Sequence, residues 1–378
     1  MALDYEAPAE RELETVDINV NVGPQHPATH GVFRMVLTVD GEQVVDLDPI
    51  VGYLHRGAEK LSENCDYRQC IGYQDRTEYL AQFNAEHCYV MAVEKLAGVK
   101  VPERAEYIRV ILAEMNRIAS HLMFVGAFGA DVGVFGTSFM YAFRERELIQ
   151  DFFEEITGER MMYAYFRAGG LAWDVPDNFA PRCRQVLESV KGGIKDLDDL
   201  LTDNEVVMIR CRGISPVKPE DAINWGLTGP MLRATGLKHD LRRAEPYSIY
   251  DRFQFDIPTG TCGDVYDRLM VRMEEMVESI RIVEQALDQL PEGPIMAEGM
   301  KRILRVPPGE VYMRTENPRG EYGVYIVSKG TDKPYRLKIR SSCFSNLSAL
   351  KSMTVGNYLA DAIVILGSTD IVLGEVDR

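Results

Sequence analysis

The chain has 378 residues, of which 58 are acidic and 42 are basic, so its formal net charge is −16. At roughly 100–200 residues per domain, this length allows one large domain or a few ordinary ones, with a sizeable buried core. The acidic excess excludes a nucleic-acid binder, because such a protein presents a basic face to the phosphates.

The seven cysteines are an odd number, and none of them forms a Cys-x-x-Cys pair. This pattern indicates reduced thiols in a cytosolic compartment rather than a disulfide framework. The acidic N-terminus lacks the basic and apolar regions of a signal peptide. No apolar run reaches the roughly 18 residues of a membrane-spanning helix. The chain is therefore expected to be soluble by itself, with any membrane role exerted through partners.

The N-terminal part of the chain predicts a short arm followed by a small sheet. Residues 1–15 are acidic and polar and predict a flexible N-terminal arm. Between 16 and 56 apolar and polar residues alternate, which predicts an N-terminal β domain. The segment GPQHPATHG at 23–31 forms a histidine-containing loop between its first two strands. Asp40-Gly41 predicts the tight turn that follows.

Residues 57–290 change to helical periodicity and predict a helical bundle core. The clearest helix spans 264–290, where apolar residues recur at alternating steps of four and three, as in the seam of a bundle. Further helices are predicted at 75–97, 107–125, 137–157 and 178–201.

Residues 291–378 predict a C-terminal β-rich segment that ends in a tail. Gly, Pro, Asn and Asp turns separate its predicted strands at 311–314, 322–327 and 335–339, and one short helix follows at about 356–366. The predicted fold class is α+β, mainly α, with a central helical bundle flanked by small N-terminal and C-terminal β-sheets.

Two histidines of the Gly/Pro loop, His26 and His30, are candidate functional residues. Their spacing suits a zinc site on a helix, but the surrounding glycines and prolines disfavour a helix, and no third ligand lies nearby in the sequence. The alternatives are a structural role, the commoner one, or an imidazole presented to a ligand as a proton donor near neutral pH.

Three further residues have a structural and a functional interpretation. Arg56 opens a helix, where it either pairs with an acid such as Glu59 or faces an anion or cofactor. Tyr89 either packs in the core or donates a hydrogen bond to a carbonyl in a cavity. Asp131 follows an apolar helix, so its carboxylate needs a donor partner, for which histidine is suited.

Motifs spread over nearly the whole chain resemble the 49-kDa (D) subunit family of respiratory complex I, the NADH–quinone oxidoreductase. They include GPQHPATHG (23–31), GYLHRGAEK (52–60), RAEYIRVILAEMNRIASHL (104–122), YAFRERE (141–147), GDVYDRLMVRMEEM (263–276) and GEVDR (374–378). This family also resembles the large subunit of nickel–iron hydrogenases. The tail at 367–374 contains no cysteine, so the ligands of a nickel site are absent and hydrogen chemistry is excluded.

The resemblance implies catalytic roles for His30, Tyr89 and Asp131 in the reduction of a quinone. His30 and Tyr89 match residues at the two headgroup carbonyls, and Asp131 matches the acid that hydrogen-bonds the histidine. His26 belongs to the same loop, and Arg56 matches an arginine near the terminal 4Fe–4S cluster of a neighbouring subunit. A phenol and an imidazole are reasonable donors of the two protons that a two-electron reduction needs.

The same resemblance implies the setting of the chain. It binds no cofactor or metal of its own, uses quinone as substrate, and couples electron transfer to proton translocation. The implied partners are the cluster-bearing B-type, the C-type (30-kDa), the I-type ferredoxin-like and the H-type membrane subunits, on the cytoplasmic face of the plasma membrane. Alternatives are the same role in a complex fed by ferredoxin or a deazaflavin, and a non-catalytic scaffold subunit.

Two departures from the family pattern stand out, the first at Met162 and the second in a short segment at 291–309. Many members carry a histidine at the position of Met162, three residues before Tyr165 in a Tyr-x-Arg-x-Gly-Gly segment. That histidine is associated with proton-coupled reduction of the cluster. We therefore expect a weakened pH dependence of the cluster potential. A redox titration checks this, and a full slope of roughly 59 mV per pH unit contradicts it.

Overall fold

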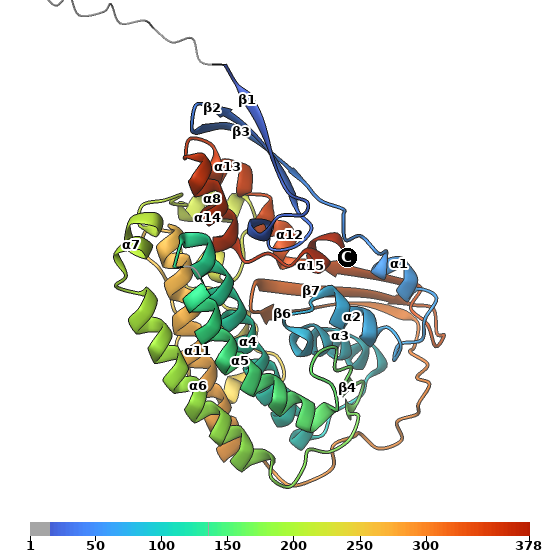
Figure 1. Ribbon diagram of the computed structural model, residues 1–378. Helices are drawn as coiled ribbons and strands as arrows, with labels where there is room; N and C mark the ends of the chain where they lie inside the picture. The colour runs from blue at the N-terminus through green and yellow to red at the C-terminus, as the bar shows by residue number, and fades with distance from the viewer. Residues whose placement is uncertain (1–15, 135) are drawn as a thin grey trace, which may run out of the picture.

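The computed structural model describes residues 16–134 and 136–378, so the arm predicted over 1–15 lies outside the described residues. Long helices pack side by side in one half of the molecule, and small antiparallel sheets lie beside and above them (Figure 1). The predicted α+β class, mainly helical with small antiparallel sheets, is confirmed.

The N-terminal sheet has the strand order β1-β2-β3, all antiparallel, with β1 at Ile18–Val22, β2 at Arg34–Asp40 and β3 at Gln43–Ile50. Along β2 every second residue is buried, which is the alternation that places one face of a sheet on the core. Gly41 takes a positive φ of 60° in the tight turn between β2 and β3. The long connection from β1 to β2 contains the histidine loop and a 3-10 turn at Pro27–Thr29.

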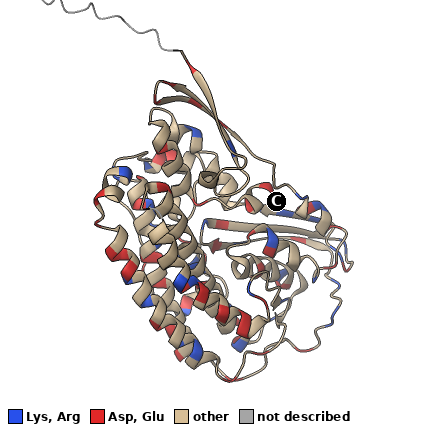
Figure 2. Cartoon of the chain, in the orientation of Figure 1, with Lys and Arg blue, Asp and Glu red and all other residues tan. Residues whose placement is uncertain are grey.

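Four long helices form the bundle: α4 (Glu103–Val132), α5 (Gly136–Thr157), α6 (Phe179–Leu201) and α11 (Val265–Asp288). The predicted ranges for α5, α6 and α11 agree with the structure to within two residues, and α4 extends beyond its prediction at both ends. Asp264 caps α11 by accepting a hydrogen bond from the Asp267 backbone N–H at 2.9 Å. Charged residues of both signs occur along these helices (Figure 2).

The predicted helix at 75–97 is wrong, because the structure has two helices there, α2 (Ile71–Thr77) and α3 (Gln82–Ala97). The backbone leaves the helical region at Glu78, where φ is −111° and ψ is 72°, and again at Ala81. Glu78 is fully buried, and its Oε1 accepts a hydrogen bond from the Arg319 guanidinium at 3.1 Å. Tertiary contacts therefore override local helix propensity at this break.

The chain after residue 291 forms a second three-stranded antiparallel sheet and four short helices, where the sequence predicted one helix. The sheet order is β6-β7-β8, and α3 packs against β6 and β7. The bounds are β6 Gly309–Asn317, β7 Gly320–Ser328, β8 Arg336–Arg340, α12 Ser342–Leu347, α13 Leu350–Thr354, α14 Leu359–Thr369 and α15 Leu373–Asp377.

Short elements complete the fold. They are α1 (Ala58–Ser62), β4 (Phe166–Arg167), β5 (Gly170–Leu171), α7 (Glu205–Cys211), α8 (Pro219–Asn224), α9 (Pro230–Arg233), α10 (Leu241–Ala244) and a 3-10 turn at Tyr250–Arg252.

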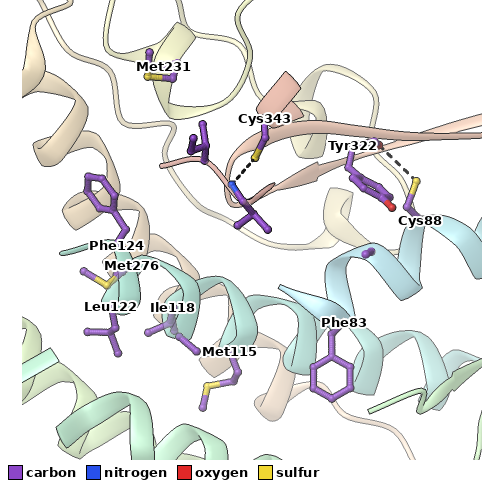
Figure 3. Packing of buried hydrophobic residues seen from close by; sticks show 14 of the residues in the cluster. Phe83, Cys88, Met115, Ile118, Leu122, Phe124, Met231, Met276, Tyr322 and Cys343 are labelled. Atoms are coloured by element: carbon purple, nitrogen blue, oxygen red, sulfur yellow. Dashed lines mark hydrogen bonds between the residues drawn. The ribbon is translucent and has the colours of Figure 1, made fainter. Parts of the chain in front are cut away.

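One continuous hydrophobic core joins helices and sheets (Figure 3). The chain's C-terminal tail closes onto its N-terminal part, because the Asp377 carboxylate accepts hydrogen bonds from the backbone N–H groups of Gly52 and Leu54 at 2.8 and 2.7 Å. The tail thereby holds the loop that follows β3 near the end of α15. None of the helices described is long and apolar enough to cross a bilayer.

Candidate functional site

The histidine loop has a backbone that fixes both of its imidazoles. Gly23 has a φ of +86°, and a Cβ at this position would lie 1.9 Å from the carbonyl oxygen of Phe33, so only glycine fits there. His26 caps the 3-10 turn by accepting a hydrogen bond from the Ala28 N–H at its Nδ1, at 3.2 Å. His30 ends the turn in the left-handed region with a φ of 52°. His26 is exposed, whereas His30 is largely buried.

His30 and Asp131 lie in direct contact, although 101 positions separate them in the chain. His30 Nε2 is 2.5 Å from Asp131 Oδ2, near the C-terminal end of α4. Burial by itself lowers the pKa of His30, but the hydrogen bond and the charge of Asp131 outweigh burial, so the pKa of His30 is raised. The pair therefore favours the protonated imidazole.

His30 and Asp131 open into a cavity of about 570 Å³, within the range of small-molecule sites. Its wall is mostly apolar, and its polar groups are few. Besides His30 and Asp131, the polar lining residues include Tyr79 and Asp370. The remaining lining residues are His26, Pro27, Ala28, Leu80, Met123, Phe124, Ala127, Ala130, Phe139, Ile363 and Ile371.

Tyr79 reaches this cavity because the chain breaks between α2 and α3. Its ring packs against Gly374, where an added Cβ would lie 2.9 Å from Tyr79 Cε1. Burial raises the pKa of Tyr79 and an ionised Glu78 raises it further, while a hydrogen bond with the Leu373 backbone acts in the opposite direction. Tyr79 thus remains a neutral phenol that can donate a proton. The sequence did not reveal this residue as a candidate, because its periodicity predicted one continuous helix over 75–97.

Tyr89 does not share this cavity. It is 1% exposed, and its hydroxyl donates a hydrogen bond to the carbonyl of Tyr67 at 2.9 Å. It lines a separate cavity of about 280 Å³, with basic residues that include Arg68 and Arg167. The structure therefore brings together His30 and Asp131 but places Tyr89 apart from them.

Arg56 also lies outside the cavity. It is exposed, and its guanidinium donates a hydrogen bond to the backbone carbonyl of Arg76 at 2.6 Å. Arg76 is exposed too and belongs to α2, two residues before the break that positions Tyr79. The two arginines place positive charge on the surface near this turn. Met162 is half-buried and has a positive φ of 64°.

A histidine held by a carboxylate and a tyrosine line one largely apolar cavity, and imidazole and phenol are both side chains that can donate protons. Such an arrangement is typical of proteins that transfer protons to a bound organic molecule.

Comparison with known proteins identifies the family. The sequence-family model of the 49-kDa subunit of respiratory-chain NADH dehydrogenase matches residues 131–305 and 298–378. The D-type NADH-quinone oxidoreductase subunit from Dehalococcoides mccartyi is 54% identical over 366 residues, which cover 97% of this chain and 100% of the relative. The D-type subunit from Carboxydothermus hydrogenoformans is 49% identical over 365 residues, with the same coverage.

The chain belongs to the family of the 49-kDa subunit of respiratory-chain NADH dehydrogenase. The resemblance that the sequence motifs indicate is thereby confirmed, and the chain is a subunit of an oxidoreductase complex.

Proposed function

We propose that the cavity lined by His30 and Tyr79 binds the headgroup of a quinone, and that the quinone is reduced there. One observation supports this most: two different proton donors, the phenol of Tyr79 and the imidazole of His30, line the same apolar cavity. A quinone has an apolar ring with two carbonyl oxygens, so its site needs an apolar wall for the ring and hydrogen-bond donors for the oxygens. Its reduction by two electrons also takes up two protons, one at each oxygen.

In this proposal each residue has one task. Tyr79 donates a proton to one carbonyl oxygen and His30 donates a proton to the other. Asp131 keeps the imidazole protonated and oriented, and its negative charge stabilises the imidazolium before the transfer. Tyr79 takes the role that the family resemblance implies for Tyr89, because Tyr89 lies in another cavity. His26 stabilises the loop at 23–31 by accepting the hydrogen bond from the Ala28 N–H that caps the 3-10 turn.

The proposed setting follows from the family. In this proposal a 4Fe–4S cluster in a neighbouring B-type subunit supplies the electrons. Arg56, whose side chain is exposed, faces that cluster, where its positive charge favours the reduced state. The C-type, I-type and H-type subunits are the other proposed partners, and the complex sits on the cytoplasmic face of the membrane and couples reduction to proton translocation. NADH is the proposed donor, with ferredoxin or a deazaflavin as alternatives. The proposed origin of the cavity is a hydrogenase-like metal site without its cysteines.

A photoreactive quinone tests the location of the site. Irradiation of the whole complex with an azidoquinone is expected to label the loop at 23–31 or the turn at 78–81, and an excess of plain quinone is expected to prevent the labelling. Labelling confined to the lining of the second cavity, around Tyr67 and Tyr89, contradicts the proposal. A scaffold subunit would show no label that plain quinone displaces.

Gly367 on α14 is expected to protect the contact between His30 and Asp131. A Cβ at Gly367 would lie 2.5 Å from Asp131 Oδ2, so Gly367→Ala pushes this carboxylate away. Quinone reduction is expected to fall by about tenfold or more, although alanine favours the helix by about 1 kcal/mol. The matched control is Gly192→Ala on α6, where no atom lies within 4 Å. Equal activities of the two variants would contradict the expectation.

A further inference from the structure

A pair of buried carboxyl groups lies behind the cavity, outside the residues that line it. Glu78 follows α2 and Glu375 belongs to α15, and both are 0% exposed. One oxygen of each carboxyl group lies within 4.8 Å of the other and of the Cys343 sulfur. The two acids come from segments almost 300 positions apart in the chain, so the tertiary fold alone brings them together.

The hydrogen bonds of the two acids differ. Glu375 accepts bonds from Ser342 and Cys343, through both backbone N–H groups and both side chains, at 2.5 to 3.2 Å. Glu78 Oε1 accepts from Arg319 at 3.1 Å. Glu78 Oε2 is buried without a donor among the described residues. A bare carboxylate oxygen in this position would be costly, whereas a protonated oxygen can donate to the neighbouring carboxylate.

The balance of buried charges around the pair also favours one proton on the two glutamates. Arg319 joins Glu78 to Asp370, which it contacts at 3.1 Å, and Arg272 lies 3.8 Å from Asp370. With both glutamates ionised, three carboxylates would face two guanidinium groups in the interior, and one proton restores neutrality. The titratable and charged groups coupled to the pair are Arg319, Asp370, Cys343, Tyr322 and Tyr79, and Arg272 acts on it only through Asp370.

A divalent metal fits this position less well than a proton. Glu78, Cys343 and Glu375 supply ligand atoms of the right type. However, the Arg319 guanidinium already bonds Glu78 and would repel a second cation. Burial also raises the pKa of the Cys343 thiol well above its ordinary value, which keeps it protonated and a poor ligand. Its sulfur instead accepts a hydrogen bond from the Val372 N–H at 3.3 Å (Figure 3).

We propose that Glu78 and Glu375 share one buried proton, and that this proton sets the charge behind the two proton donors of the cavity. Glu78 directly precedes Tyr79, and Glu375 follows Gly374, which touches the Tyr79 ring. Arg319 links the pair to Asp370, which lines the cavity near His30. Both acids are positioning residues, since neither lines the cavity. The coupling to quinone reduction rests on the proposed function, whereas the shared proton does not.

Within the pair the shared proton lies nearer Glu78, because Glu78 Oε2 receives no donor among the described residues whereas both Glu375 oxygens accept hydrogen bonds. Burial raises the pKa of Glu78 well above its ordinary value, with the neighbouring Glu375 raising it further, whereas the hydrogen bonds that Glu375 receives outweigh burial and lower its pKa. When rising pH removes this proton, the new negative charge raises the pKa of Tyr79 further. Tyr79 then becomes a weaker acid, so proton transfer to the substrate slows in the alkaline range.

Infrared spectroscopy of the purified complex, carrying Glu78→Gln, tests the shared proton directly. A carboxamide keeps the acceptor for Arg319 and the donor toward Glu375, so the fold is expected to persist. The wild-type minus variant difference spectrum is expected to show the loss of one carboxylic-acid C=O band, without any quinone present. The control is Glu86→Gln, since Glu86 forms a second buried pair with Asp75; it is expected to remove a different band. An unchanged Glu78→Gln spectrum would overturn the proposal.

The pH profile of quinone reduction tests the coupling. Glu78→Gln is expected to keep activity at low pH and to move the alkaline limb of the profile to higher pH, because its charge no longer changes. A profile that superimposes on the wild type, together with loss of the band, would overturn the coupling and leave only the shared proton. Failure of the proposed quinone site would appear separately, as full activity of a Tyr79→Phe variant with the band intact.

Discussion

Replacing Tyr79 by phenylalanine is expected to lower quinone reduction by the complex about a hundredfold or more, the usual effect of removing a positioned general acid. The change deletes only the hydroxyl, and the ring still packs against Gly374. Steady-state assays with a short-chain quinone measure the loss. Electron flow to an artificial acceptor that bypasses the cavity is expected to continue at the wild-type rate.

Tyr89→Phe is the matched control for this variant. The Tyr89 hydroxyl bonds the Tyr67 carbonyl in the second cavity, so its removal is expected to cost about 1 kcal/mol of stability and little activity. The two tyrosines thereby distinguish the two cavities. A large loss of activity in Tyr89→Phe, with Tyr79→Phe unaffected, would return the role to Tyr89.

Replacing Asp131 by asparagine is expected to slow quinone reduction by about 10²–10⁴-fold near neutral pH. Without the carboxylate, burial dominates and the pKa of His30 falls below its ordinary value of 6.5. The imidazole then loses its proton before it can donate it. The pH optimum is expected to move toward lower pH, where the remaining activity is highest.

The stability of the same variant has a defined pH dependence. Because Asp131 raises the pKa of His30 in the folded chain, the pair stabilises the fold fully below about pH 6.5, and this stabilisation is lost as the pH rises through the raised pKa. The stability deficit of Asp131→Asn is therefore expected to be largest in acid and to shrink in alkali. Thermal unfolding across this range measures it.

Asp361→Asn provides the control for Asp131→Asn. Asp361 is a largely buried acid on α14 that lies 3.6 Å from Arg210, away from the cavity. The same chemical change there is expected to leave the pH profile of quinone reduction unaltered. A matching shift of the profile in both variants would show that the effect of Asp131→Asn is not specific to His30.

The spacing of apolar residues predicted the long helices and strands, because an element that buries one face has apolar residues at regular intervals along its own sequence. The seam of α11 and the alternation of β2 follow directly from apolar spacing. The break between α2 and α3 carries no glycine or proline, so no local signal marks it. It depends on the buried hydrogen bond that Glu78 accepts from Arg319, a residue 241 positions away.

The sequence by itself determined the family and a helical bundle with a small sheet on either side of it in the chain, and it singled out His30 and Asp131 as candidates. These features rest on local patterns and on motifs that are contiguous in the chain. Only the tertiary structure decided which tyrosine shares the cavity with His30, and that Glu78 and Glu375 meet behind it. The physical reason is that a cavity and a shared proton depend on groups from distant segments, whose approach no local periodicity encodes.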